Sequence, residues 1–200
     1  QTLKGQPGVT KTIEAEKKRF VGPEIKGKKL GVIGLGAIGA MVANDALALG
    51  MDVVGYDPFI TIEAAWSLRK EVKRASSLEQ LVADCDIITI HVPLTDKTRD
   101  TINEEIFAKM KKGVILVNCA RGGLTDTEAL IEGIESMQIG ALGMDTAEGE
   151  EGIIHCDRRS DIIANRNWFY LHQFRNVIMT QHMAFYTEQA VDSMVQCGIE

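Results

Sequence analysis

A glycine-rich turn between an apolar run and a helical pattern restricts the fold of this chain more than any other feature. Residues 29–57 read KLGVIGLGAIGAMVANDALALGMDVVGYD. The apolar run 30–33 predicts a buried strand, and a helical pattern begins just after the glycines. A second apolar run, 53–56, predicts another strand and ends at an acid, Asp57. The segment therefore predicts a strand, a turn, a helix and a second strand in one compact unit.

The three glycines of the turn match the needs of a dinucleotide site. Gly34 permits a tight turn, Gly36 lets a pyrophosphate approach the backbone, and Gly39 lets the helix pack closely on the strand. The start of the helix offers free N–H groups and the positive end of its dipole to phosphates. The alternative is an ordinary strand–helix turn that binds nothing. The acid at the next strand end favours the dinucleotide site.

Asp57 also indicates which dinucleotide is bound. An acid at this strand end accepts hydrogen bonds from a ribose diol. A carboxylate would repel a 2′-phosphate, and Pro58, Phe59 and Ile60 supply no cation to receive one. The sequence therefore predicts NAD rather than NADP as the cofactor.

The rest of the chain continues to alternate between apolar runs and helical patterns. Such alternation predicts a doubly wound parallel sheet of the Rossmann type, an α/β fold covered on both faces. In such sheets the ligand lies beyond the C-terminal ends of the strands. The expected strands after the first unit are 72–75, 86–92, 113–118, 139–144 and 177–180, and the expected helices are 62–70, 77–83, 103–110, 126–136, 168–174 and 187–197, with part of another within 14–20.

Composition narrows the class of protein. A hydrophobic content of 45% and a charged content of 25% over 200 residues are ordinary for a globular protein with a real core. The net charge of −6 argues against a nucleic-acid surface, and the basic cluster 109–112 is interpreted as a solvated helix end. No apolar run approaches the roughly 20 residues that cross a bilayer, and no signal segment is evident. We expect a cytoplasmic protein.

The cysteines predict neither a metal site nor a disulfide framework. Cys85, Cys119, Cys156 and Cys197 are widely spaced and match no ligand or bridge pattern. We expect reduced thiols and no bound metal.

Three polar residues follow predicted strands on the rim where the cofactor would lie. Arg121 offers a planar fork of donors for a carboxylate. His182 is the side chain suited to proton transfer near neutrality, and Glu150 would fix its ring and favour the imidazolium. Each residue alone has an ordinary structural explanation. Together they predict reversible reduction of a 2-keto acid to a 2-hydroxy acid, with Arg121 also polarising the carbonyl and the glycines 122 and 123 leaving room for its guanidinium.

At this point the chain resembles the NAD-binding domain of the D-isomer-specific 2-hydroxyacid dehydrogenases along nearly its whole length. GLGAIG, GYDPF, HVPLT, NCARGG, GMDTAEGE and the histidine of TQHMAFYT carry the resemblance. It implies Arg121, Glu150 and His182 as the catalytic residues, with His182 as proton donor to the keto oxygen. It further implies cofactor contacts from Gly34, Gly36, Ala37, Ile38, Gly39, Asp57, Val92, Pro93, Thr98, Cys119, Ala120, Arg121, Asp145 and His182. Within that set Asp57 holds the adenosine ribose, Val92, Pro93 and Thr98 line the adenine side, Cys119 and Ala120 line the nicotinamide side, and Asp145 holds the carboxamide. Plain core packing is the alternative for Val92, Cys119 and Ala120.

The resemblance also implies a division of the chain. Residues 1–28 would lead in from a substrate domain, 29–185 would form the NAD-binding domain, and 186–200 would lead back. Since that substrate domain is missing from the sequence, we expect a fragment or an excised domain that binds NAD and turns over nothing alone. Its partners would be a small 2-keto or 2-hydroxy acid and a second copy in a homodimer, with no nucleic acid or membrane. For the dimer, exposed apolar surface around Met41, Met51 or Trp66 is one idea, and core packing is the other.

The two halves of the chain resemble different branches of the family. Residues 1–107 are most similar to phosphoglycerate dehydrogenases, whereas the part from Asp145 onward is similar to D-lactate dehydrogenases. A natural mosaic and an artificial chimera both account for this. The histidine and its AFYT neighbours favour a D-lactate dehydrogenase-like activity. A D-3-phosphoglycerate dehydrogenase and a non-catalytic NAD-sensing module remain the alternatives.

Overall fold

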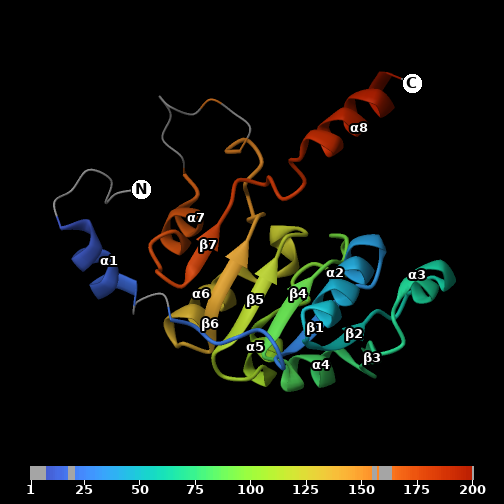
Figure 1. Ribbon diagram of the computed structural model, residues 1–200. Helices are drawn as coiled ribbons and strands as arrows, with labels where there is room; N and C mark the ends of the chain where they lie inside the picture. Colours follow the sequence, from blue (N-terminus) through green and yellow to red (C-terminus); the bar gives the residue numbers. More distant parts are fainter. Residues whose placement is uncertain (1–7, 18–20, 155–156, 158–163, 200) are drawn as a thin grey trace.

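A single parallel sheet of seven strands forms the body of the protein (Figure 1). The structure, a computed structural model, describes residues 8–17, 21–154, 157 and 164–199. The strand order is β3-β2-β1-β4-β5-β6-β7, and every pair is parallel. The strands are β1 (Lys29–Ile33), β2 (Asp52–Tyr56), β3 (Lys73–Arg74), β4 (Ile87–Ile90), β5 (Val114–Asn118), β6 (Ile139–Met144) and β7 (Val177–Met179). The predicted Rossmann-type sheet is confirmed.

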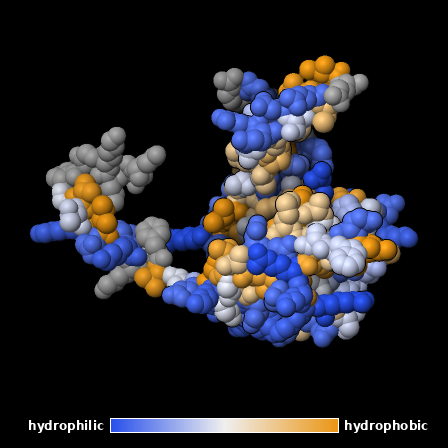
Figure 2. All heavy atoms as spheres, turned by 45° about the vertical axis from the view of Figure 1, so that its right-hand side comes forward, coloured by the Kyte–Doolittle hydropathy of each residue, from blue (hydrophilic) through white to orange (hydrophobic). Residues whose placement is uncertain are grey.

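Helices connect the strands, as the sequence predicts. They are α1 (Val9–Glu16), α2 (Ala37–Ala48), α3 (Ile62–Ser67), α4 (Leu78–Asp84), α5 (Glu104–Lys109), the 3₁₀ turn η2 (Gly122–Leu124), α6 (Thr127–Glu135), α7 (Arg166–Leu171) and α8 (Glu188–Ile199). Among the described residues, α1 and α8 have no buried side chain. Figure 2 shows both as arms that stand off the body. No helix in the described part of the chain is long and apolar enough to cross a membrane.

Side-chain caps explain where several helices begin. The Ser77 hydroxyl accepts a hydrogen bond from Gln80 N at 3.2 Å at the start of α4. The Asp126 carboxylate accepts from two amides in the first turn of α6. Several helices differ from prediction in their bounds; the helix expected over 168–174, for example, is α7 (Arg166–Leu171). The helix expected within 14–20 starts earlier, at Val9, and residues 18–20 lie outside the described part.

The helix predicted over 62–70 is shorter than expected. It ends at Ser67, because Asn44 of α2 binds the chain there. The Asn44 side chain donates to Ser67 O at 2.8 Å and accepts from Arg69 N at 2.9 Å. These bonds satisfy the backbone groups at the helix end and turn the chain toward β3.

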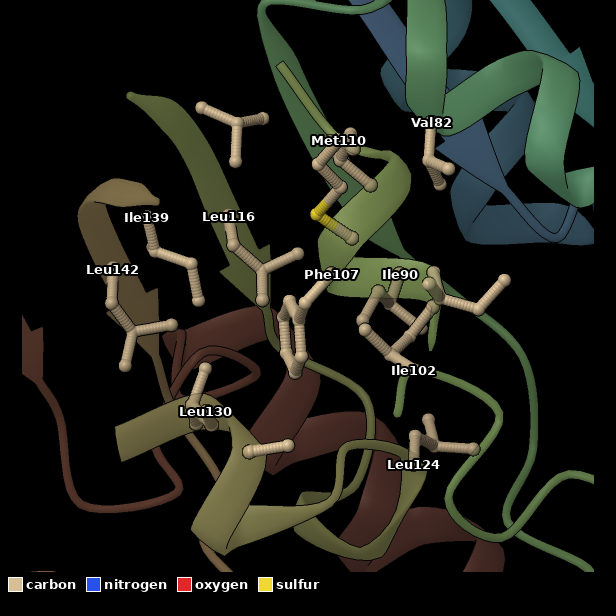
Figure 3. Close-up of a cluster of buried hydrophobic side chains, with 14 of the residues drawn as sticks. Val82, Ile90, Ile102, Phe107, Met110, Leu116, Leu124, Leu130, Ile139 and Leu142 are labelled. Carbon is tan, nitrogen blue, oxygen red and sulfur yellow. The ribbon is translucent and has the colours of Figure 1, made fainter. Parts of the chain in front are cut away.

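The core lies on both sides of the sheet. Alternate residues of β1 separate the two layers: Leu30 and Val32 pack under α2, whereas Ile33 belongs to the larger layer under α4, α5 and α6. Figure 3 shows that larger layer, where Phe107 of α5 meets strand side chains. Coverage is less complete toward β7, where Ile178 is 71% exposed. Met51 is buried in the α2 layer, so of the two uses considered for it core packing is the one observed.

Strand order reverses between β1 and β4, which lie side by side although a long stretch of chain separates them. The connections from β1 run one way across the sheet and those from β4 run the other way. Ligands of open α/β sheets bind at such a switch point, beyond the C-terminal strand ends. The predicted site residues follow β1, β2, β4, β5, β6 and β7 on this rim.

Candidate active site

The glycine turn after β1 leaves space at one position and none at two others. Gly34 has φ of +89°, and a side chain there would lie 2.8 Å from the His91 backbone. A Cβ on Gly39 would lie 1.9 Å from Gly34 O, so α2 can pack this closely only with glycine. A Cβ on Gly36 would meet nothing within 4 Å. The turn and packing roles of Gly34 and Gly39 are as predicted, while Gly36 faces open space.

The N-terminus of α2 opens into that space. Gly36 precedes the helix and supplies no side-chain cap. The first intrahelical bond runs from Ala40 N to Gly36 O at 2.9 Å, so the preceding amides lie ahead of the helix ladder. Ala37 and Ile38 are exposed, the latter by 62%. An open helix N-terminus with glycine beside it fits a pyrophosphate.

Asp57 follows β2 and is tied to the same turn. Its Oδ2 accepts a hydrogen bond from Leu35 N at 2.9 Å, and its Oδ1 accepts from Phe59 N at 2.8 Å. A carboxylate has about four acceptor positions, so two remain for a ribose diol. Asp57 is half-buried, next to the glycine turn where an adenosine ribose would need it.

Residues after β4 form the neighbouring wall. The side chain of Val92 faces Gly34, and Pro93 is exposed. The Thr98 hydroxyl donates to Pro93 O at 2.6 Å and accepts from Thr95 N at 2.8 Å. Thr98 therefore closes a turn, which is a structural role that the sequence did not predict. Its contact with the adenine stays a prediction.

Asn118 at the end of β5 organises the turn that carries Arg121. Its side chain is 1% exposed; Nδ2 donates to Arg121 O at 2.9 Å and Oδ1 accepts from Ala120 N at 3.1 Å. Arg121 itself is exposed and donates from Nη1 to Ala120 O at 2.7 Å. Cys119 as a whole residue is exposed, but its thiol is partly buried. This burial and the charge of Asp145 raise the pKa of the thiol. Sequence reasoning missed Asn118, although its position between a buried strand and a glycine turn is a signal for such a role.

The two glycines after Arg121 have a packing role that the sequence did not predict. A Cβ on Gly122 would lie 2.2 Å from Ala147 C and Glu148 N, so the backbone of that loop packs directly on Gly122. A Cβ on Gly123 would lie 3.0 Å from Arg99 Nη1. The glycines therefore make room for the loop after β6 and for Arg99, while space for the Arg121 guanidinium stays a prediction.

Asp145, after β6, holds the loop that follows β7. Its carboxylate accepts from Met183 N at 2.9 Å, from Ala184 N at 2.8 Å and from the Thr180 hydroxyl, and its backbone oxygen accepts from His182 N at 2.8 Å. Burial opposes ionisation, but these hydrogen bonds outweigh it and hold the Asp145 pKa below its usual value. One acceptor position is left for a carboxamide.

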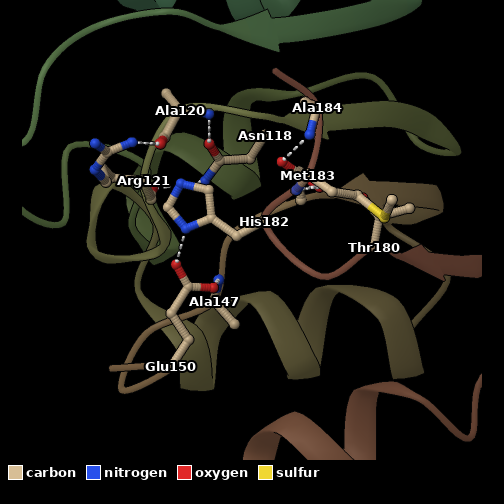
Figure 4. Close-up of polar contacts among 10 residues, drawn as sticks. Asn118, Ala120, Arg121, Ala147, Glu150, Thr180, His182, Met183 and Ala184 are labelled. Carbon is tan, nitrogen blue, oxygen red and sulfur yellow. Dashed lines mark hydrogen bonds and ion pairs between the residues drawn. The ribbon is translucent and has the colours of Figure 1, made fainter. Parts of the chain in front are cut away.

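His182 and Glu150 meet beside Asp145. His182 Nδ1 lies 2.8 Å from Glu150 Oε1, and Ala147 N donates to Glu150 Oε2 at 2.7 Å. Glu150 is 7% exposed, so its carboxylate is shielded from solvent. His182 has φ of +52°, a left-handed conformation that is uncommon for a residue with a side chain. Figure 4 shows Arg121 and Glu150 on two sides of the His182 ring.

A pocket of about 320 Å³ opens next to this group. It contains two arginines and three glutamates, so its lining carries more negative than positive charge. Its lining residues are Leu94, Arg99, Arg121, Gly122, Gly123, Ala147, Glu148, Gly149, Glu150 and Glu151. The rim thus combines an exposed arginine, a histidine–glutamate contact and an open helix N-terminus. In the described part of the chain, no group of three acidic, cysteine or histidine side chains could hold a metal.

Residues 4–184 match the family model of the D-isomer specific 2-hydroxyacid dehydrogenase NAD-binding domain. The chain belongs to this family, whose members are oxidoreductases, and it is their NAD-binding domain, so its cofactor is NAD. An aromatic 2-oxoacid reductase of Clostridium sporogenes is 41% identical over 178 residues, which are 88% of this chain and 52% of the reductase. A D-3-phosphoglycerate dehydrogenase of Methanocaldococcus jannaschii is 49% identical over 137 residues, 68% of this chain and 26% of that enzyme.

Solved structures agree with this assignment. The crystal structure of D-lactate dehydrogenase with NAD⁺ from Lactobacillus jensenii superposes with a TM-score of 0.79 at 34% identity, over 94% of this chain and 58% of that one. The alignments with the Clostridium sporogenes reductase and the Lactobacillus jensenii enzyme cover most of this chain but only about half of each relative.

Proposed function

We propose that this chain is the cofactor-binding part of an NAD-dependent D-2-hydroxyacid dehydrogenase that reduces a 2-oxo acid. The observation that carries the proposal is the contact between His182 Nδ1 and Glu150 Oε1 at 2.8 Å, on the rim that also carries Arg121. A buried carboxylate on one ring nitrogen orients the imidazole for proton transfer from the other. NADH, when bound, supplies the hydride for the carbonyl carbon.

Each residue has a distinct role in this proposal. Arg121 binds the substrate carboxylate through its planar fork of donors. His182 donates a proton to the carbonyl oxygen from Nε2, the ring nitrogen that faces away from Glu150. The cofactor contacts are the glycine turn with Ala37 and Ile38, then Asp57, Val92, Pro93, Thr98, Cys119, Ala120 and Asp145.

A substrate with a single negative group, as in D-lactate dehydrogenases, suits the pocket better than a phosphorylated one. Glu148, Glu150 and Glu151 outnumber Arg99 and Arg121 there, and Arg99 already pairs with Glu148. A second anionic group would therefore meet net negative charge. The identity to a phosphoglycerate dehydrogenase favours the second candidate, D-3-phosphoglycerate dehydrogenase activity.

The test uses the longer enzyme that contains these residues. NADH oxidation is followed with pyruvate, phenylpyruvate and 3-phosphohydroxypyruvate, and His182→Gln is compared with the unsubstituted enzyme. We expect turnover of the unphosphorylated acids and a loss of roughly 10²–10⁴-fold in kcat for the variant, with NADH affinity retained. Unchanged turnover by His182→Gln would reject His182 as the proton donor. Preference for the phosphorylated acid would favour the second candidate.

We also propose the division of the chain and its assembly. Residues 29–185 would be the cofactor domain, and 1–28 and 186–200 would lead to a substrate domain without which this chain is inactive. The absence of buried side chains from α1 and α8 supports this. A homodimer is proposed from exposed apolar residues such as Met41 and Trp66, and sedimentation at several concentrations tests it.

A further inference from the structure

The loop that carries Glu150 is tied to two other segments by a residue with no role in the proposed reaction. We call residues 145–150 the Glu150 loop. Within it, the Glu148 carboxylate contacts Arg99 Nη1 at 3.3 Å through Oε1 and accepts from the Thr127 hydroxyl at 3.0 Å through Oε2. Arg99 belongs to the turn after β4, and Thr127 is the first residue of α6. One side chain therefore links three segments of the rim.

We propose that Glu148 is a positioning residue that holds the Glu150 loop so that Glu150 reaches His182. The inference rests on the proposed function of the Glu150–His182 pair. The Glu148 carboxylate contacts Arg99 and Thr127. In this proposal it therefore acts through Glu150 and is not itself a catalytic residue.

The path of the loop explains why its outer end needs to be fixed. Gly149 has φ of +69° and reverses the chain directly after Glu148. The reversal lets the Glu150 side chain return to Ala147 N at 2.7 Å and to His182. A shift of Glu148 would therefore be passed through one flexible residue to the carboxylate that orients the imidazole.

Contacts beneath the loop determine the direction in which it can move. The backbone of Ala147 and Glu148 rests on Gly122, where even a Cβ would come within 2.2 Å. The loop therefore cannot move inward at Gly122, which leaves movement away from the segment of Arg121 open to it. The Glu148 side chain, anchored to Arg99 and Thr127, opposes that outward movement.

Asn165 provides a second anchor for the same loop. Its Nδ2 donates to Glu148 O at 2.9 Å, while its Oδ1 accepts from Trp168 N at 3.0 Å and caps α7. The two halves of this amide can be tested separately. Asn165→Asp keeps an acceptor for the cap and removes the donor to the loop, so it loosens the loop without removing the cap.

Because the Arg99–Glu148 ion pair is exposed, we expect it to affect the position of the Glu150 loop rather than the stability of the whole fold. The side chains of Arg99 and Glu148 are 49% and 46% exposed, and ion pairs in that setting contribute little to folding. Removing Glu148 should therefore leave the fold intact and change the His182–Glu150 hydrogen bond.

Nitrogen-15 NMR of the histidine rings in this 200-residue chain tests the proposal directly. The His182 resonances are assigned by their loss in His182→Gln, and Glu150→Ala shows the Nδ1 shift without the carboxylate. We expect Glu148→Ala to move Nδ1 toward that value and Glu148→Gln, which keeps an acceptor for Thr127, to restore part of the difference. Glu151→Ala, an exposed neighbour, is the matched control and should change nothing.

An Nδ1 resonance of Glu148→Ala identical to that of the unsubstituted chain would overturn the proposal. If Glu148→Ala does not fold, Arg99→Gln and Asn165→Asp carry the same expectation and the same refutation. In the longer enzyme Glu148→Ala should lower kcat more than it raises KM, because Arg121 is untouched. If that enzyme reduces no 2-oxo acid, the proposed function fails, whereas the His182 resonance still decides the positioning role.

Discussion

Gly36 and Gly39 lie three residues apart in one turn, yet alanine should have different effects at the two positions: weaker NADH binding at Gly36 and lower stability at Gly39. At Gly36 a Cβ meets nothing within 4 Å, and the backbone, with φ of −68°, accepts alanine without strain. The free energy of unfolding should therefore change by less than about 1 kcal/mol. At Gly39 the Cβ would lie 1.9 Å from Gly34 O, a backbone atom that cannot rotate away. Overpacking of this kind costs about 1–3 kcal/mol, or more.

NADH binding should be affected by alanine at Gly36, the position where stability is not. The methyl group of Gly36→Ala would occupy the space through which a pyrophosphate reaches the amides of Ala37 and Ile38. Loss of one hydrogen bond to a charged group costs about 1.5–3 kcal/mol, which weakens binding roughly 10- to 100-fold. Gly36→Ala should thus keep its melting temperature and lose affinity, whereas Gly39→Ala should melt about 2–12 °C lower.

Calorimetry and titration of NADH fluorescence measure the two quantities on the same samples. Equal NADH affinity of Gly36→Ala and the unsubstituted chain would show that the phosphates bind elsewhere. Equal melting temperatures for Gly39→Ala and the unsubstituted chain would refute the packing argument.

Three other predictions concern the rest of the rim. Gly122→Ala should lower the melting temperature and disturb the His182 ring resonances, because its Cβ would lie 2.2 Å from the Ala147 backbone; unchanged spectra would contradict this. Since the Asp145 pKa is lower in the folded chain than in the unfolded one, its contribution to stability is complete above about pH 4 and is lost as the pH falls through the folded value. Urea unfolding of Asp145→Asn should lack that loss. Cys85 is fully buried and burial raises its pKa to about 12, whereas Cys119 is exposed, so an alkylating reagent should modify Cys119 and spare Cys85. NADH should protect Cys119, as peptide mass spectrometry can show.

Sequence patterns were sufficient for the sheet, because its strands are continuous apolar runs and its turns contain strong local signals. The doubly wound arrangement followed from the handedness of crossovers, which does not depend on side-chain detail. The helix ending at Ser67 was mispredicted because Asn44, which stops it, lies in another helix. The sequence alone did not decide between core packing and exposure for Met41, Met51 and Trp66, since no local pattern reveals which face a neighbouring layer covers; only Met51 is buried.

The candidate site divides in a similar way. Arg121, Glu150 and His182 could be selected because strand ends of a parallel sheet share one rim, and the contact of His182 with Glu150 agrees with that choice. The contacts that hold them in place could not be predicted. Asp145 was selected as a cofactor residue, but its hydrogen bonds to the loop after β7 were not foreseen, and neither were those of Asn118 within its own turn or the packing of Gly122 on a distant loop.

The strand that leads to His182 is a short strand at one edge of the sheet. β7 has three residues, pairs only with β6 in the described part of the chain, and exposes most of Ile178. Segments with so few buried contacts open at a lower free-energy cost than the centre of a domain. Fraying of this edge would dismantle the proton-transfer half while the coenzyme half, built on β1 and β4, stayed folded. On warming, such an enzyme would lose turnover before it lost nucleotide binding. The amide protons near β7 would exchange before those of β1 and β4.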